Sequence, residues 1–192
     1  MRTVPVTGMP RGPGVVRRAL LLALVCLLAV GLPAAAAGLH RPAALERGTQ
    51  TGLPLPRFAR LKSGVANLRR GPGLRYPIAW VYRRRDLPVL ILREFGNWRL
   101  LRLPDGTRGW MHRALLTGGR SFVVTARRAT VRGSPSSRAA PVARLRHGVI
   151  GALHRCERKV PWCAVRIHGY SGFVRRTEIW GSDGDARSRG RG

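Results

Sequence analysis

The feature that most constrains the fold is the stretch at residues 98–110. Successive side chains there are expected to point to alternate sides, with Trp98 and Leu100 on one side. This period of two is typical of a β-strand. Residues 104–106 are Pro-Asp-Gly, which favours a tight turn because Gly tolerates positive φ and Asp hydrogen-bonds its own backbone. The stretch therefore predicts a β-hairpin, with a second strand leading into Trp110.

The chain carries this hairpin twice, because residues 162–173 repeat its pattern. Each copy belongs to a unit of about 60 residues with several short strands, which predicts an all-β protein of two tandem small β-barrels. We interpret the residues shared by the hairpins as structural, packing in the core or the hairpin of each barrel. They are Trp98, Gly109 and Trp110 in the first copy and Trp162, Gly172 and Phe173 in the second.

Composition sets the expected boundaries along the chain. Residues 38–57 contain several Pro and Gly and show no periodicity, and the C-terminal residues are polar and rich in Gly and Arg. We therefore expect a signal peptide at 1–37, a flexible linker at 38–57, the first module at 58–118, the second at 119–181 and a disordered tail at 182–192.

The N-terminus predicts export. A basic region precedes the apolar run at residues 19–32, and small residues follow it. This order is typical of a secretory signal, and the run is short for a bilayer span. We expect cleavage near Ala36 or Ala37 and a periplasmic or secreted protein. An uncleaved membrane anchor is the alternative.

Two cysteines remain once Cys26 is assigned to the signal. In an exported protein, the pair Cys156 and Cys163 predicts a disulfide. The competing interpretation is a metal site, because His154 and His168 flank the pair, but the spacing does not match that of zinc sites. We expect no metal and no cofactor.

Catalytic patterns are not found in the sequence. No spacing places two carboxylates together as acid and base, and neither a nucleophile elbow nor a phosphate-binding loop occurs. The protein is therefore expected to bind and not to catalyse.

Several motifs in combination resemble the bacterial SH3-like domains. In the first half these are N-L-R-x-G-P at 67–72, W-V-Y at 80–82, L-P-V at 87–89 and N-W…P-D-G-x-x-G-W at 97–110; in the second half they are W-C at 162–163, G-Y-x-G-F-V at 169–174 and I-W-G at 179–181. The resemblance implies exported tandem proteins of Gram-negative bacteria with SH3-like barrels. It also implies a binding role that concerns cell-wall (peptidoglycan) peptides or envelope proteins.

Aromatic residues that differ between the copies are the candidates for ligand binding, because the shared ones must build the fold. Trp80 and Tyr82 have the same strand parity and should share a face, with Tyr76 nearby. Together they are expected to line a groove for an extended peptide. Partial burial at a barrel mouth is the alternative. The arginines expected to attract peptide carboxylates beside this groove are Arg69, Arg83 and Arg84.

The net charge of the chain is compatible with more than one kind of partner. The net charge is +28, and all but two of the 36 basic residues are Arg. Such a charge fits a solvated basic surface, or attraction to anionic envelope polymers or lipid headgroups. Export makes nucleic acid the least expected polyanion.

Overall fold

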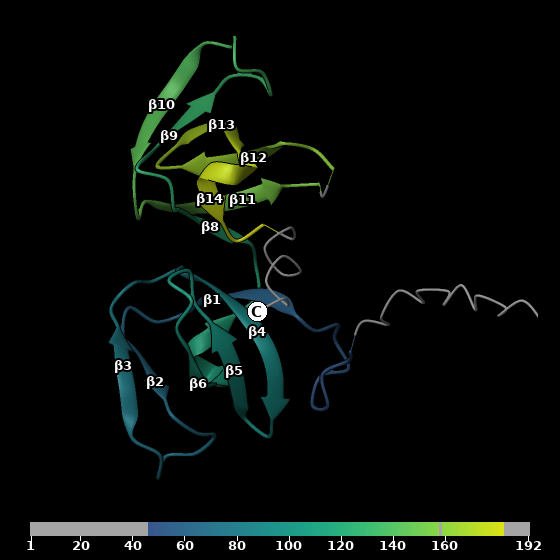
Figure 1. The fold of residues 1–192 in the computed structure, drawn as a ribbon, viewed down its shortest axis with the longest axis vertical. Coiled ribbons are helices and arrows are strands. Elements are labelled where there is room, and N and C mark those ends of the chain that lie inside the picture. The colour runs from purple at the N-terminus through teal and green to yellow at the C-terminus, as the bar shows by residue number, and fades with distance from the viewer. Residues whose placement is uncertain (1–45, 158, 183–192) are drawn as a thin grey trace, which may run out of the picture. The chain divides into compact units, whose positions relative to one another are not determined.

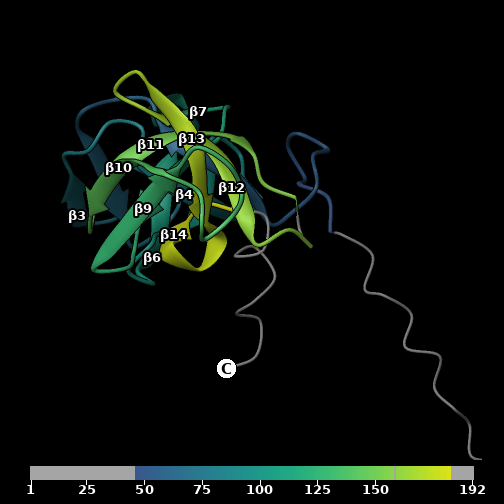
Figure 2. The ribbon, with the colours of Figure 1, turned by 90° about the horizontal axis from the view of Figure 1, so that it is seen from above.

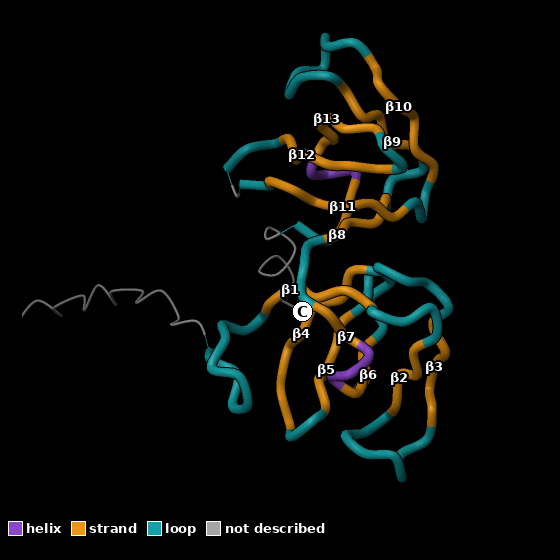
Figure 3. The backbone as a smooth tube through the Cα atoms, turned by 180° about the vertical axis from the view of Figure 1, so that it is seen from behind, coloured by secondary structure: helices purple, strands orange, loops and turns teal. Residues whose placement is uncertain are grey.

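The computed structural model describes residues 46–157 and 159–182. The predicted signal peptide, the first part of the predicted linker and residues 183–192 of the predicted tail lie outside this range. The described chain is all-β, as predicted, and forms two seven-stranded antiparallel sheets (Figure 1). Helical structure in the described residues is limited to the short 3₁₀ turns η2 and η3 (Figure 3). No helix in this part of the chain is long and apolar enough to cross a bilayer.

The first module contains the sheet β3-β2-β6-β5-β4-β1-β7. Its elements are β1 (Arg57–Leu61), β2 (Ala66–Arg69), β3 (Ile78–Tyr82), β4 (Pro88–Phe95), β5 (Trp98–Arg102), β6 (Arg108–His112), η2 (Arg113–Leu115) and β7 (Leu116–Thr117). The long central strand β4 pairs with β1 on one side and β5 on the other.

The second module repeats this topology as β10-β9-β13-β12-β11-β8-β14, and Figure 2 shows β9, β13 and β12 side by side. Its elements are β8 (Ser121–Val124), β9 (Arg128–Arg132), β10 (Pro141–Arg146), β11 (Ile150–Arg155), β12 (Trp162–Ile167), β13 (Tyr170–Arg175), η3 (Arg176–Glu178) and β14 (Ile179–Trp180). The internal repeat read from the sequence is thus a repeat of topology.

Each hairpin turns its alternate residues into a core. In β5 and β6, Leu101 and Met111 are fully buried, and Val165 and Val174 are their counterparts in β12 and β13. The turn of the first hairpin is held by Asp105, whose Oδ1 accepts a hydrogen bond from the Thr107 backbone N–H at 2.9 Å. The hairpins therefore supply the inner wall of each barrel.

The glycines of the hairpins are required by close packing between strands. A Cβ at Gly109 would lie 2.6 Å from Leu68 and 2.9 Å from the Arg69 carbonyl oxygen. A Cβ at Gly172 would lie 2.5 Å from the Arg132 carbonyl oxygen. Only glycine lets β6 approach β2, and β13 approach β9, this closely.

Part of the predicted linker, from residue 46 onward, is structured instead. Leu55 is buried in the first core, and a turn at residues 49–51 packs against β4. The backbone N–H groups of Gln50 and Thr51 donate to the Glu94 carboxylate at 2.9 and 3.0 Å. The segment departs from the expected flexibility because it fills a core position and caps a buried charge.

We expect Gly172→Ala to destabilise the protein by about 1–3 kcal/mol, because the added methyl group overpacks the contact with β9. The midpoint of urea denaturation measures this. Gly64→Ala is the matched control, since a Cβ there meets nothing within 4 Å. Equal midpoints for the two variants would contradict the proposed close approach.

Glu94 should make stability depend on pH. Burial raises the pKa of Glu94, but hydrogen bonds from Arg57, Thr51 and Gln50 outweigh it and lower the pKa from 4.5 to about 2. A depressed pKa stabilises the fold above the unfolded value of 4.5, and this stabilisation is lost as the pH falls toward 2. The loss should amount to about 3 kcal/mol. Urea denaturation at several pH values between 6 and 2 measures this loss. Glu94→Gln should flatten the pH dependence of the free energy of unfolding, whereas Glu157→Gln should not.

Candidate functional site

The predicted groove residues Trp80 and Tyr82 lie on the edge strand β3. They pair in register with Leu68 and Ala66, both buried, so Trp80 and Tyr82 do share a face. Trp80 is nevertheless 60% exposed, whereas Tyr82 is half-buried against the first core. Burial, and secondarily Asp105, raises the pKa of Tyr82. Tyr82 is therefore largely a packing residue, and Trp80 is the exposed aromatic of the pair.

Tyr76 lies in the loop between β2 and β3 and has its own local partners. Its ring covers Gly71, where a Cβ would collide with it, and the Arg75 guanidinium lies 5.2 Å from the ring centroid. The Tyr76 carbonyl oxygen accepts a hydrogen bond from Arg69 Nη1 at 2.7 Å. Tyr76 therefore belongs to the structure of this loop.

Two of the three arginines predicted to attract carboxylates hold backbone carbonyls. Besides Tyr76, Arg69 donates to Leu74, and Arg84 donates to Gly148 at 2.7 Å. Arg83 is exposed. A peptide groove over Tyr76, Trp80 and Tyr82 stays a prediction.

A different surface emerges on the outer face of the first hairpin. Cross-strand pairing puts Arg93 beside Leu100, Leu100 beside Trp110, and Trp110 beside Arg69. These four residues form a row across β4, β5, β6 and β2. Trp98 lies next along β5, and its ring meets the ring of His112 edge-on at 5.4 Å.

The second module carries the same row. Arg155 pairs with Ala164, Ala164 with Phe173, and Phe173 with Arg132, across β11, β12, β13 and β9. Trp162 lies beside it, with the Arg175 guanidinium 5.0 Å from its ring centroid. We call these two surfaces the outer rows, each composed of Arg, an apolar residue, an aromatic residue and Arg.

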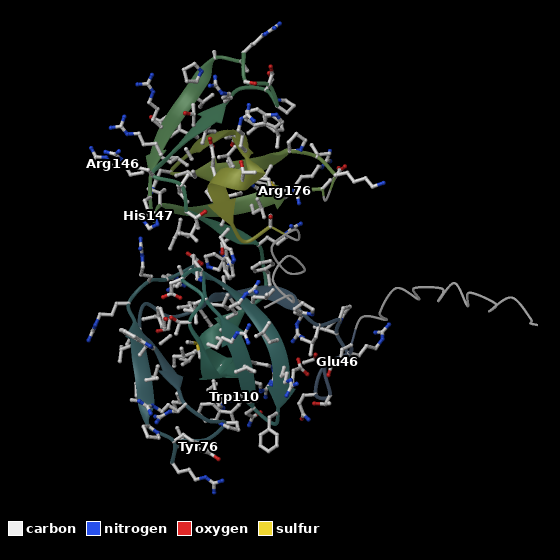
Figure 4. The ribbon with its side chains drawn as sticks, in the orientation of Figure 1. Glu46, Tyr76, Trp110, Arg146, His147 and Arg176 are labelled. Carbon is white, nitrogen blue, oxygen red and sulfur yellow. A yellow bond between two sulfur atoms is a disulfide. The ribbon has the colours of Figure 1, made fainter. Side chains whose placement is uncertain are left out.

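The loop after β2 or β9 borders each outer row. Arg132 donates to the Ala139 carbonyl at 2.6 Å, just as Arg69 donates to Tyr76. Figure 4 shows Tyr76 and Trp110 at the same end of the first module. Arg69 and Arg132, at one end of each row, therefore hold the adjacent loop. Arg93 and Arg155, at the other end, are exposed.

The shared aromatics, expected to pack in the core or on the hairpin of each barrel, lie on the outer face of the hairpins and not in the core. Trp98, Trp110, Trp162 and Phe173 are half-buried on the outer face, because strand alternation gives the inner positions to other residues. The core therefore does not explain why aromatics recur at these positions. The two modules therefore present the same kind of aromatic surface on their outer faces.

The outer row of the second module is hollowed. A pocket of about 180 Å³ lies there, with Arg155, Glu157, Val160 and Pro135 around its apolar base of Trp162, Ala164 and Phe173. Ala164 and Phe173 are each smaller than their counterparts in the first module, Leu100 and Trp110. The hollow has room for one side chain and is smaller than a typical small-molecule site.

The predicted disulfide shapes this pocket. Cys156 and Cys163 are bonded, with their Cα atoms 4.4 Å apart, and the loop that they close contributes Glu157 and Val160 to the pocket wall. Among the described residues, no group of three or more His, Cys, Asp or Glu side chains is arranged to hold a metal ion.

Sequence comparison places these barrels in a known family. The family profile described as Bacterial SH3 domain matches residues 62–118 and 125–181, more than half of the chain. The chain belongs to the bacterial SH3 domain family. No curated protein matches it.

Solved structures that match the chain include NlpC2 and NlpC1 from Trichomonas vaginalis and an NlpC/P60 family protein from Bacillus cereus ATCC 10987, each 14% identical. They cover 65%, 72% and 65% of this chain, with TM-scores of 0.30, 0.31 and 0.29. The chain spans only 48%, 51% and 57% of their lengths.

Proposed function

We propose that the chain is a non-catalytic binding protein of the cell envelope whose two bacterial SH3 modules recognise carboxylate-bearing peptides, of the cell wall or of an envelope protein, through their outer rows. The observation that carries this proposal is the recurrence of the same Arg–apolar–aromatic–Arg order on the outer face of both modules.

The residue types suit an extended acidic peptide. Trp and Phe offer large apolar area at a low cost in side-chain entropy, and aromatic and Arg residues dominate binding hot spots. A guanidinium binds a carboxylate through two parallel hydrogen bonds. The exposed Arg93 and Arg155 lie at one end of their rows, where they can meet such a carboxylate.

Structural roles for three of the described carboxylates support a binding role over catalysis. Asp86 pairs with Arg60 at 3.0 Å, Asp105 holds its turn, and Glu94 accepts hydrogen bonds from several donors. Each of the three has a structural partner. The disulfide and the family membership support an extracytoplasmic location, which the proposed export to the periplasm would provide.

A second candidate function is electrostatic binding to anionic envelope polymers or lipid headgroups. The net charge of +28 favours it. The two functions differ in their dependence on salt, because interactions between exposed charges are screened beyond about 8 Å at physiological ionic strength.

Cosedimentation with purified peptidoglycan sacculi at physiological salt tests the proposal. We expect Trp110→Ala with Phe173→Ala to reduce retention about tenfold or more, since these are the aromatic residues of the two outer rows and large aromatics that a partner buries are typical hot spots. Trp80→Ala is the matched control, an exposed Trp on the edge strand. Retention that survives the double substitution, falls with Trp80→Ala and persists in salt would move the site to the predicted groove. Retention lost only with added salt would favour the electrostatic function.

A separate prediction concerns the pocket in the second module, which should contribute to binding. Ala164→Leu should fill it while leaving the melting temperature nearly unchanged, because Leu100 occupies the equivalent position in the first module. We expect retention on sacculi to fall in this variant, since a ligand side chain loses its pocket. Ala140→Leu, which enlarges an exposed side chain just before β10 and away from the pocket, is the control. Unchanged retention with Ala164→Leu would show that the hollow takes no part in binding.

A further inference from the structure

We propose that the first module has a second binding site, separate from its outer row, for the C-terminal carboxylate of a peptide that ends in an apolar residue. The site is a cavity of about 340 Å³ between the segment before β1 and strands β1, β4, β5 and β7. Its charged lining residues are three arginines, Arg57, Arg99 and Arg113. None of its lining residues belongs to an outer row or to the predicted groove.

The cavity carries more positive than negative charge. Its one neighbouring carboxylate, Glu94, pairs with Arg57 at 2.6 Å and with Arg99 Nε at 3.5 Å. The same carboxylate also accepts from the backbone N–H groups of Gln50 and Thr51 and, at 2.8 Å, from the Thr51 hydroxyl. A carboxylate offers about four acceptor positions, so Glu94 is fully used.

One arginine is left with an unmet hydrogen bond. Arg57 Nη1 is buried without a hydrogen-bond partner. Arg99 Nη1 donates to the carbonyls of Gly96 and Trp98, and Arg113 Nε donates to the Asn97 side chain at 2.9 Å. A buried donor without an acceptor is costly, more so when it is charged. An incoming carboxylate can meet the exposed Arg113 directly, and it would supply Arg57 Nη1 with an acceptor once the Arg57 side chain turns toward the cavity.

The arginines also repel one another. Burial lowers the pKa of Arg99, Glu94 raises it, and the charges of Arg57 and Arg113 lower it further. The direction of the shift agrees with a cluster that one carboxylate does not neutralise. A second anion would relieve the repulsion.

The apolar residues that line the cavity favour a ligand whose carboxylate is attached to an apolar group. Phe58, Ile91 and Leu116 give the cavity apolar walls. Its volume lies at the small end of the range for ligand pockets, enough for one large side chain and its terminal backbone. An apolar C-terminal residue offers the carboxylate and the apolar body together, and the Arg fork fits that carboxylate in two-point geometry.

Titration of the full chain with N-acetyl-Ala-Leu, followed by amide NMR shifts, tests the site. The matched probe is N-acetyl-Ala-Leu amide, which differs only in lacking the terminal charge. We expect the acid to bind about tenfold more tightly than the amide, as for a hydrogen-bonded charge pair, and to shift the signals of residues around the cavity. Equal affinity for acid and amide would overturn the proposal.

Arg113→Gln should remove most of the preference for the acid. Arg113 is exposed and makes no contact with Glu94 that the fold needs, so the variant is expected to keep its melting temperature. Arg108→Gln, an exposed arginine on β6 outside the cavity, is the control and should bind like the parent chain. Unchanged preference in Arg113→Gln would overturn the site.

A competition experiment with decanoate tests whether the ligand is a fatty acid and not a peptide. Tighter binding of decanoate than of the dipeptide, with competition between them, would overturn the peptide assignment in favour of a fatty acid. Failure at this cavity leaves retention on sacculi through the outer rows untouched, because the two measurements use different residues.

Discussion

The structure depends on a close approach between two strands that only glycine allows. At Gly109 and Gly172 the hairpin lies directly against β2 and β9. This pairing connects the hairpin to the outer pair of strands in the sheet of each module. The same approach sets Trp110 beside Arg69 and Phe173 beside Arg132. The contact that completes the barrel therefore also assembles the outer row, so fold and candidate site have one origin.

Much of the fold could be predicted from local patterns. The period of two, the turn residues and the internal repeat predict paired strands in two similar barrels, and the two cysteines predict their bond. What the pattern does not reveal is which of its two faces turns inward. Trp98 and Leu100 are as apolar as Leu101, so the alternation alone cannot choose between them, and the choice follows from packing between distant strands. For that reason the sequence left open whether the shared aromatics pack in the core or on the hairpin, and in the structure they lie on the outer face of the hairpin.

The same limit explains the segment before β1. Its composition is typical of a linker, and its structure comes from Glu94, whose contact with Thr51 spans 43 residues of sequence. Glu94, the acceptor of this hydrogen bond, lies on β4. The composition of residues 38–57 alone therefore cannot reveal the contact. The cavity of Arg57, Arg99 and Arg113 was missed for the same reason, since its members come from β1, β5 and η2. An excess of arginine in the sequence gave no sign of where arginines converge.

The position of β1 has a consequence for dissecting this protein. In the sheet, β1 lies between β4 and β7, and β8 lies between β11 and β14. The two family matches begin at residues 62 and 125, directly after these strands. A fragment cut at either limit would leave the backbone of β4 or β11 unpaired along one side, and unpaired strand edges recruit other chains. Aggregation of such fragments would then report a misplaced cut and say nothing about whether a single module can fold.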